Sequence, residues 1–300
     1  MKRSFSKTDW RSPIPGTSLD AAGLIALADL NTIAHRTVLS GSANLLDALV
    51  LCPGIHRQQK APDLNCGELP PTAALTTGYV FRVENQATVV YLQSVGIKGH
   101  LVSLAVEKVR KGTWYRLWTE LFGPTTSTFS VILLMVAMQL TVAFVTLLMI
   151  LEDWWGSAIL LILIMARLMN IILIRRRTKP SWHGALEPGK TGDLLILLSQ
   201  DRWLRMQGSV DALKTVTAGQ WLSDMTFFES FLDASATILV YISAALATNA
   251  SQTGKILLMA LLLISVGLLG ICNQQEKALY MHGLVVKANG KPKHMPGAST

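Results

Sequence analysis

The chain has few charged residues, few aromatic residues and almost no cysteine, and each shortage excludes a class of protein. Charged residues make up 15% of its 300 residues and aromatic residues 7%, beside 50% hydrophobic residues. Soluble domains carry about 25% charged residues, so this composition favours a membrane protein. The three cysteines, Cys52, Cys66 and Cys272, form no Cys-x-x-Cys pair. Disulfide frameworks, zinc sites and thioredoxin chemistry are therefore without support.

Motifs of catalysis and cofactor binding are also missing from the sequence. It contains no Gly-x-Ser-x-Gly elbow and no aspartate-rich pair that would bind a diphosphate. Its six histidines are scattered, and no two have the spacing that places both imidazoles on one helix face to bind a metal. We therefore assign no catalytic residue, no metal ligand and no cofactor from the sequence.

One phosphate-binding pattern does occur. Residues 184–191 read GALEPGKT, a match to G-x-x-x-x-G-K-[ST]. Phosphate binding by this pattern needs a strand before the loop and a helix N-terminus after it. Here the basic stretch RRRTKPSWH precedes the loop, and GDLLILL, which predicts a strand, follows it. We interpret the match as accidental.

Long apolar runs are what the chain has in abundance. A helix of about 20 residues crosses the roughly 30 Å hydrocarbon layer, and these runs are apolar on all faces, unlike a surface helix of a soluble protein. A further stretch, residues 37–55, is an alternative fifth span, although Asp47 disfavours it. We predict an α-helical membrane protein with four transmembrane helices and a small cytosolic α+β region. The predicted helices cover residues 127–151, 155–174, 227–248 and 256–272.

Basic residues gather on one side of these spans, which predicts their orientation. They precede the first span and follow the second and fourth, whereas the two short links offer only Lys255. Cytoplasmic flanks collect Lys and Arg, so both termini are predicted in the cytosol, at a plasma membrane or endomembrane. The net charge of +8 then reflects topology and attraction to anionic lipid, not nucleic-acid binding. The predicted cytosolic parts are residues 1–120, 175–226 and 273–300.

The second outer link carries a modification signal. Asn249, Ala250 and Ser251 form an N-glycosylation sequon, and the orientation places it outside the cytosol. Asn249 is therefore a candidate glycosylation site, although its position within a few residues of the membrane disfavours access by a glycosylating enzyme.

Two β-hairpins are predicted in the cytosolic parts, at residues 79–93 and 193–208, because β-branched and aromatic runs flank polar turns there. Ser209 is expected to cap a helix that runs toward Trp221. Lone hairpins are marginal in water, so we expect both regions to share one subdomain. Short amphipathic helices are predicted at residues 21–30 and 45–51, and a loop at 57–72.

Charged residues within the spans form the main candidate site. Arg167 lies about eight residues into the second span from its cytosolic end, at roughly the depth of Asp233 in the third, and Glu229 lies one turn nearer the cytosol. Charges at such depth usually pair or line a path, so we predict an Arg167–Asp233 contact. Asn170 and Gln139 are predicted polar neighbours. In the alternative interpretation Arg167 snorkels to the interface and the acids lie near the boundary.

Small residues predict how the spans pack. The third span carries Ala236 and Ser243, and the fourth carries Ser265 and Gly267. Small side chains let membrane helices approach closely, so we expect the third and fourth spans to pack against each other.

Several blocks of the sequence resemble one group of proteins. They are GDLLILLSQDRWLRMQG, QWLSDMTFFESFL, FGPTTST and LEDWWG. Together they are similar to a group of multi-pass integral membrane proteins from filamentous fungi, over about residues 23–284. The resemblance implies membrane topology and a fungal source, and it implies no site residue.

Three functional hypotheses follow. The first is a membrane-anchored scaffold or sensor with the lipid bilayer and a cytosolic protein as partners, because about half of the chain is predicted cytosolic. The second is a small channel or transporter that works as a homo-oligomer and uses the charged residues of the spans. The third is a membrane-embedded enzyme acting on a lipid or hydrophobic metabolite. It requires a cluster of four residues, His183, Asp201, Arg202 and Asp224.

Overall fold

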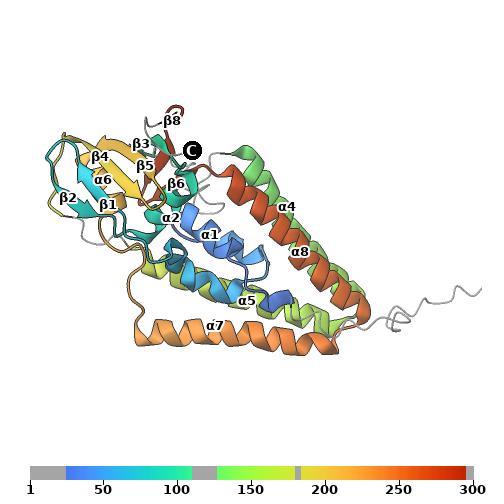
Figure 1. Ribbon diagram of the computed structural model, residues 1–300. Coiled ribbons are helices and arrows are strands. Elements are labelled where there is room, and N and C mark those ends of the chain that lie inside the picture. Colours follow the sequence, from blue (N-terminus) through green and yellow to red (C-terminus); the bar gives the residue numbers. More distant parts are fainter. Residues whose placement is uncertain (1–24, 110–126, 180–183, 295–300) are drawn as a thin grey trace, which may run out of the picture.

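The computed structural model describes residues 25–109, 127–179 and 184–294, and it joins four long helices to a mixed β-sheet (Figure 1). All four helices are long and apolar enough to cross a membrane. At about 1.5 Å per residue their lengths match the hydrocarbon layer, so the four predicted spans are confirmed as helices of sufficient length. They are α4 (Thr128–Ile150), α5 (Trp154–Arg177), α7 (Phe227–Leu246) and α8 (Gln252–Gln275).

Polar residues at the helix starts explain where three of the spans begin. Asp153 caps α5 by accepting a hydrogen bond from the Gly156 N–H at 2.9 Å. Thr226 and Glu229 form a reciprocal capping box at the start of α7. Ser251 caps α8, so this helix begins at Gln252, four residues before the predicted start of the fourth span. Side-chain oxygens at these positions satisfy backbone N–H groups that have no partner within the helix.

The four helices form two pairs that differ from the predicted arrangement. Helix α7 packs on α5, and α8 packs on α4. The pairs meet at the end away from the sheet and diverge toward it (Figure 1). The predicted seam between the third and fourth spans is therefore wrong. In α8, a Cβ added at Gly267 or Gly270 would meet nothing within 4 Å, so these glycines do not face a close helix neighbour.

Residues 25–65, which we call the wedge segment, fill the opening between the two pairs. The segment consists mainly of α1 (Thr32–Leu39), η2 (Leu45–Leu49) and η3 (Ile55–Asn65), the last two being 3-10 helices. It packs against α4 and α8 on one side and against α5 and α7 on the other. The alternative fifth span at residues 37–55 is wrong, because the chain turns several times there. The predicted loop at 57–72 is also wrong over η3.

The described part of the chain forms a sheet of eight strands, in the order β2-β1-β4-β5-β3-β7-β6 with β8 pairing β3. Among these strands β3 and β5 pair in parallel, and the other pairs are antiparallel. The predicted hairpin at 193–208 is confirmed, with Leu198 opposite Arg202. The strands are β1 (Pro71–Ala74), β2 (Val80–Arg82), β3 (His100–Lys108), β4 (Thr191–Leu198), β5 (Arg202–Ser209), β6 (Ala278–Met281), β7 (Leu284–Ala288) and β8 (Lys293–His294).

The predicted hairpin at residues 79–93 is wrong. Its second half forms α2 (Gln86–Val95), which Asn85 caps by accepting a hydrogen bond from the Thr88 N–H at 3.1 Å. The stretch from Ala87 to Leu92 is buried. Its β-branched side chains favour a strand, but a helix satisfies the buried backbone N–H and C=O groups within the segment itself. The first half pairs instead with β1.

Two further findings complete the sheet region. Ser209 caps α6 (Val210–Thr217) as expected, accepting a hydrogen bond from the Ala212 N–H at 3.3 Å. Residues 273–300 were predicted as a tail, but β6, β7 and β8 belong to the sheet. The sheet therefore draws strands from the segments before α4, between α5 and α7, and after α8, so its position depends on all four spans.

Candidate functional site

Three buried charged residues lie where the wedge segment meets the spans. Arg36 in α1 is 1% exposed, Asp47 in η2 is 3% exposed and Arg167 in α5 is 1% exposed. The Nε of Arg167 donates to the backbone oxygen of Asp47 at 3.4 Å. The charge of Arg167 interacts favourably with Asp47 and unfavourably with Arg36. We call these three residues the buried charge cluster.

The cluster contains more hydrogen-bond donors than acceptors. The Nε, Nη1 and Nη2 atoms of Arg36 have no hydrogen-bond partner within the described part of the chain, and neither does Nη1 of Arg167. Asp47 has one unpartnered oxygen, Oδ1, while its Oδ2 accepts a hydrogen bond from Asn44 Nδ2 at 3.4 Å. Most buried polar groups in proteins are hydrogen-bonded, so this group of donors is unusual.

A second polar group nearby is well satisfied. Gln59 in η3 donates to the Oδ1 of Asn170 in α5 at 3.1 Å, and its own Oε1 accepts from Arg177 Nη1 at 3.1 Å. Asn170 also donates to the Ile55 oxygen at 3.3 Å. These bonds attach η3 to α5. Because the side-chain amides of Gln59 and Asn170 are both hydrogen-bonded, we interpret this polar group as structural.

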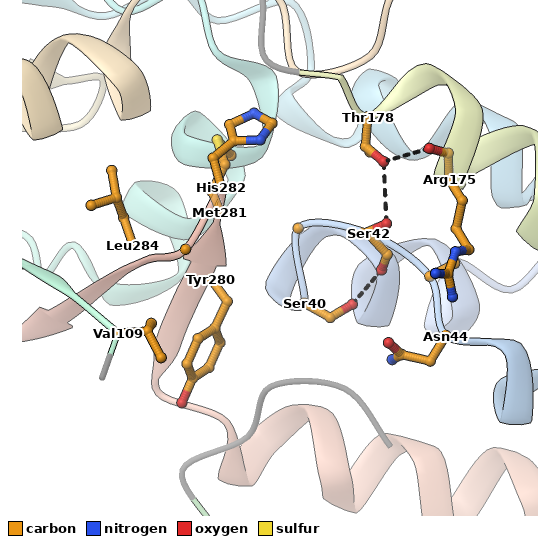
Figure 2. Close-up of a pocket in the computed structure, with 13 residues that line it drawn as sticks. Ser40, Ser42, Asn44, Val109, Arg175, Thr178, Tyr280, Met281, His282 and Leu284 are labelled. Carbon is orange, nitrogen blue, oxygen red and sulfur yellow. Dashed lines mark hydrogen bonds between the residues drawn. The ribbon is translucent and has the colours of Figure 1, made fainter. Parts of the chain in front are cut away.

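A cavity of about 390 Å³ lies between the spans and the sheet (Figure 2). We call it the junction pocket. The end of α5 contributes Arg175 and Thr178, the turn after α1 contributes Ser40 through Asn44, and the β6–β7 hairpin closes the opposite side. The hydroxyls of Ser42 and Thr178 are 3.2 Å apart. Because Asn44 lines the pocket and bonds Asp47, it connects the pocket to the buried charge cluster.

The structure does not form the predicted contact between Arg167 and Asp233. Arg167 points to the wedge segment, whereas Asp233 lines a separate small cavity with Asp29 and Lys60. The wedge segment instead supplies the groups that Arg167 meets, which are the backbone oxygen of Asp47 and the charge of its carboxylate. Glu229 closes the capping box of α7 and also pairs with Arg176 at 3.4 Å.

The predicted polar neighbours of Arg167 are likewise placed elsewhere. Gln139 is exposed on the outer surface of α4, so it does not face the cluster. Asn170 is buried, but it bonds Gln59 and Ile55 instead of Arg167.

The three described residues that the enzyme hypothesis uses share no side-chain hydrogen bond or ion pair with one another. Asp201 and Arg202 lie at the β4–β5 turn, where Arg202 donates to the Gln93 oxygen at 3.1 Å. Asp224 is exposed just before α7, and His183 lies outside the described residues. The described members therefore form no cluster, and the enzyme hypothesis stays a hypothesis.

The phosphate-binding pattern has the context expected of an accidental match. Thr191, the last residue of the pattern, is the first residue of β4, so no helix N-terminus follows the loop. Lys190 Nζ donates to Glu187 at 2.9 Å, and Lys214 contacts the other oxygen of Glu187 at 2.6 Å. These two ammonium groups lower the pKa of Glu187 to about 2.

Asn249 lies exposed in η4 (Ala247–Asn249), next to the start of α8. The sequon hydroxyl, that of Ser251, bonds the carboxylate of Asp153 in the folded chain. Glycosylation of Asn249 stays a prediction.

Sequence reasoning missed Arg36 and used Asp47 only as an argument against a fifth span. The available signal was the apolar stretch at residues 37–55, which Arg36 precedes and Asp47 interrupts. Comparison of the chain with protein-family models, with curated proteins and with solved structures finds no match.

Proposed function

We propose that the protein is a membrane-anchored sensor and scaffold, in which the state of the junction pocket is passed to the cytosolic sheet. The observation that carries this proposal is the origin of the pocket walls. Arg175 and Thr178 belong to the end of a span, and residues 280–284 belong to the sheet. A ligand in this pocket would contact both parts at once, so its binding would favour one relative placement of them.

The outer edge of the sheet supports the scaffold role. Strand β2 is an edge strand, and Tyr79 and Val80 there are 68% and 64% exposed. Leu75, in the turn of the same hairpin, is 51% exposed. Exposed apolar residues beside an unpaired strand edge suit the addition of a partner strand or segment. The edge lies at the far side of the sheet from α4 and α8 (Figure 1).

The channel hypothesis has less support. Its candidate residues do not share a face: Arg167 faces the wedge segment, Asp233 a separate cavity, and Gln139 the outer surface. A conducting path needs polar groups that follow one another across the membrane.

Proximity labelling in the native cells tests the proposal. A biotin ligase fused after Thr300 would label neighbours of the wild type, of Val80→Glu, and of Ser42→Trp, which fills the junction pocket. We expect Val80→Glu to remove a defined set of neighbours and Ser42→Trp to change the recovery of the same set. Ile97→Glu, at a 44% exposed apolar residue elsewhere in the sheet region, is the matched control. Identical labelling for all four proteins would refute the proposal.

A further inference from the structure

We propose that the junction pocket binds a phosphate group, held by the guanidinium of Arg175 and by the backbone N–H groups of residues 42–44. The inference deepens the proposed sensor function by naming the ligand class, and it rests on that function for the link between the pocket and the sheet. The cavity of about 390 Å³ supplies the space, since ligand pockets in proteins span roughly 300–1,000 Å³.

Arg175 brings an unpaired guanidinium to the pocket. Helix α5 ends with three successive arginines. Arg176 pairs with Glu229 at 3.4 Å, and Arg177 donates to the Ser223 oxygen at 2.8 Å. The side chain of Arg175 makes no hydrogen bond or ion pair within the described part of the chain, and it is exposed where it lines the pocket. Its five N–H donors are therefore accessible to a ligand that enters.

The turn after α1 brings unpaired backbone donors to the same pocket. Gly41, with φ of +65°, redirects the chain, and the three residues that follow it line the cavity. The N–H groups of Ser42, Ala43 and Asn44 donate to no described residue. Ala43 and Asn44 are 3% and 6% exposed, and buried N–H groups are nearly always paired. Successive N–H groups in a turn form concave sites for anions, so the pocket needs a ligand rich in acceptors.

The charge of the lining also favours an anion. Among the described residues that line the pocket, Arg175 carries the one permanent charge and none is acidic. A guanidinium pairs with two oxygens of a phosphate, and such charge-assisted hydrogen bonds are stronger than neutral ones. The neighbouring buried layer holds two acids and two arginines, so it adds no net charge. These four residues are Asp47, Glu276, Arg36 and Arg167.

The pocket opens to the surface at the end of a span. Figure 2 shows Arg175 and Asn44 on one side of the cavity and Tyr280 and His282 on the other. Arg175, His282 and Gly283 are exposed, so a ligand has access between the end of α5 and the β6–β7 turn. The headgroup layer of a bilayer lies at the level where spans end. A lipid headgroup and a free phosphate are thus the two sources of the group.

The test uses the purified full chain in dodecyl maltoside, which contains no phosphate, after native mass spectrometry has shown the preparation to be free of lipid. Thermal unfolding is followed with sodium phosphate and with sodium chloride at equal ionic strength. It is also followed with dioctanoyl phosphatidic acid and with dioctanoylglycerol, which has the same chains without the phosphate. We expect the unfolding temperature to rise with sodium phosphate, with phosphatidic acid or with both.

The four additions separate the two sources. A rise with phosphatidic acid alone identifies a lipid headgroup, and a rise with sodium phosphate identifies a free phosphate. Chloride and dioctanoylglycerol should give no rise. The proposal is overturned if neither phosphate compound raises the unfolding temperature, or if chloride matches sodium phosphate and dioctanoylglycerol matches phosphatidic acid.

Variants assign the effect to the pocket. Arg175→Gln should weaken binding of the phosphate compound roughly tenfold, because it removes a charge-assisted pair, and Arg175→Lys should weaken it less. Arg176→Gln removes the same charge one residue away and should bind as the wild type does. Because Arg175 is exposed and unpaired, its substitution should leave folding intact. Equal binding by Arg175→Gln and the wild type, or equal losses in Arg175→Gln and Arg176→Gln, would overturn the assignment.

Failure of this inference and failure of the proposed function give different results. If phosphate does not bind but labelling of neighbours still depends on Val80, the scaffold function stands without this ligand. If phosphate binds but Arg175→Gln labels the same neighbours as the wild type in cells, the site stands and its link to the sheet fails.

Discussion

Gly41 lies where the wedge segment, the sheet and the span ends meet. Its φ is +65°, in the left-handed region that favours glycine, and a Cβ there would lie 1.8 Å from the Tyr280 backbone oxygen. Its own oxygen accepts a hydrogen bond from the buried indole of Trp221 at 3.0 Å. No side chain fits at this position, which explains the choice of glycine within an otherwise apolar stretch.

We expect Gly41→Ala to destabilise the protein far more than Gly283→Ala does. Both glycines have positive φ, so both substitutions carry a left-handed penalty of about 1–2 kcal/mol. Only position 41 adds a clash with fixed backbone, because nothing lies within 4 Å of a Cβ at Gly283. The clash should cost roughly a further 3 kcal/mol. Thermal unfolding in detergent measures the difference, and equal losses would contradict this account.

His35 predicts a pH dependence of stability. Burial lowers the pKa of His35 below its ordinary value of 6.5, because the charged form is poorly solvated. The unfolded chain therefore binds the proton more readily than the folded chain. The contribution of neutral His35 to stability is present above pH 6.5 and is lost as the pH falls below it.

The substitution that tests this dependence is His35→Gln, which cannot titrate. We expect the wild type to lose more stability than His35→Gln between pH 7 and pH 5 in chemical unfolding of the detergent-solubilised protein. His294→Gln, at an exposed histidine on β8, should follow the wild type. Equal losses of stability for the wild type and His35→Gln over this range would show that His35 does not cause the pH dependence.

At the scale of elements, one carboxylate joins the two helix pairs at the end away from the sheet. Asp153 caps α5 through the Gly156 N–H at 2.9 Å and accepts a second bond from the Ser251 N–H at 3.1 Å. Ser251 in turn caps α8. A Cβ at Gly254 would lie 2.1 Å from the Asp153 carboxylate, so the glycine allows this approach. The pairs are thereby held together where they meet.

We expect Asp153→Ala to lower the free energy of unfolding by about 2 kcal/mol, since it removes one helix cap and the support of another. Asp153→Asn, which keeps one acceptor oxygen, should lose less. Asn249→Gln, exposed on the same side of the bundle, should change stability little. Denaturant titration in mixed micelles would measure all three. A loss for Asp153→Ala no larger than that for Asn249→Gln would show that the bridge contributes nothing.

At the scale of the whole molecule, the diverging helix pairs enclose protein and not an open path. The wedge segment contributes Val50, Leu51 and Cys52 to the same apolar core as Leu134 and Leu163 of the spans. Irregular backbone at the depth of a span is tolerated when protein buries it, and the wedge segment meets that condition. The opening between the pairs is therefore closed from the side of the sheet.

This closure leads us to expect no conductance. Proteoliposomes containing the full chain should release a trapped anionic or cationic dye no faster than liposomes without protein do. A mutant lacking residues 25–65 would not serve as a control, because these residues carry part of the core. Arg167→Ala is the better comparison, and it should also stay impermeable. Dye release that depends on Arg167 would favour the channel hypothesis instead.

Local patterns predicted some elements well and others poorly. The β4–β5 hairpin was predictable because two apolar runs flank the polar residues Gln200 and Asp201. The structure places these two residues in the turn, with φ of 63° and 56°. Helix α2 was not, since its Val89, Val90 and Tyr91 favour strands by propensity. Burial of this segment against the strands and the wedge segment decided its form.

The sequence by itself determined the four spans, because a run of apolar side chains about 20 residues long is a local property that already specifies its solvent. The caps that start three of them were found only in the structure, where Ser251 places the start of α8 at Gln252. The tertiary structure alone decided which residue meets Arg167, which helices pair, and which three distant segments share a sheet. These depend on contacts between residues such as Asp47 and Arg167, 120 positions apart, and no pattern within either segment encodes such a pairing.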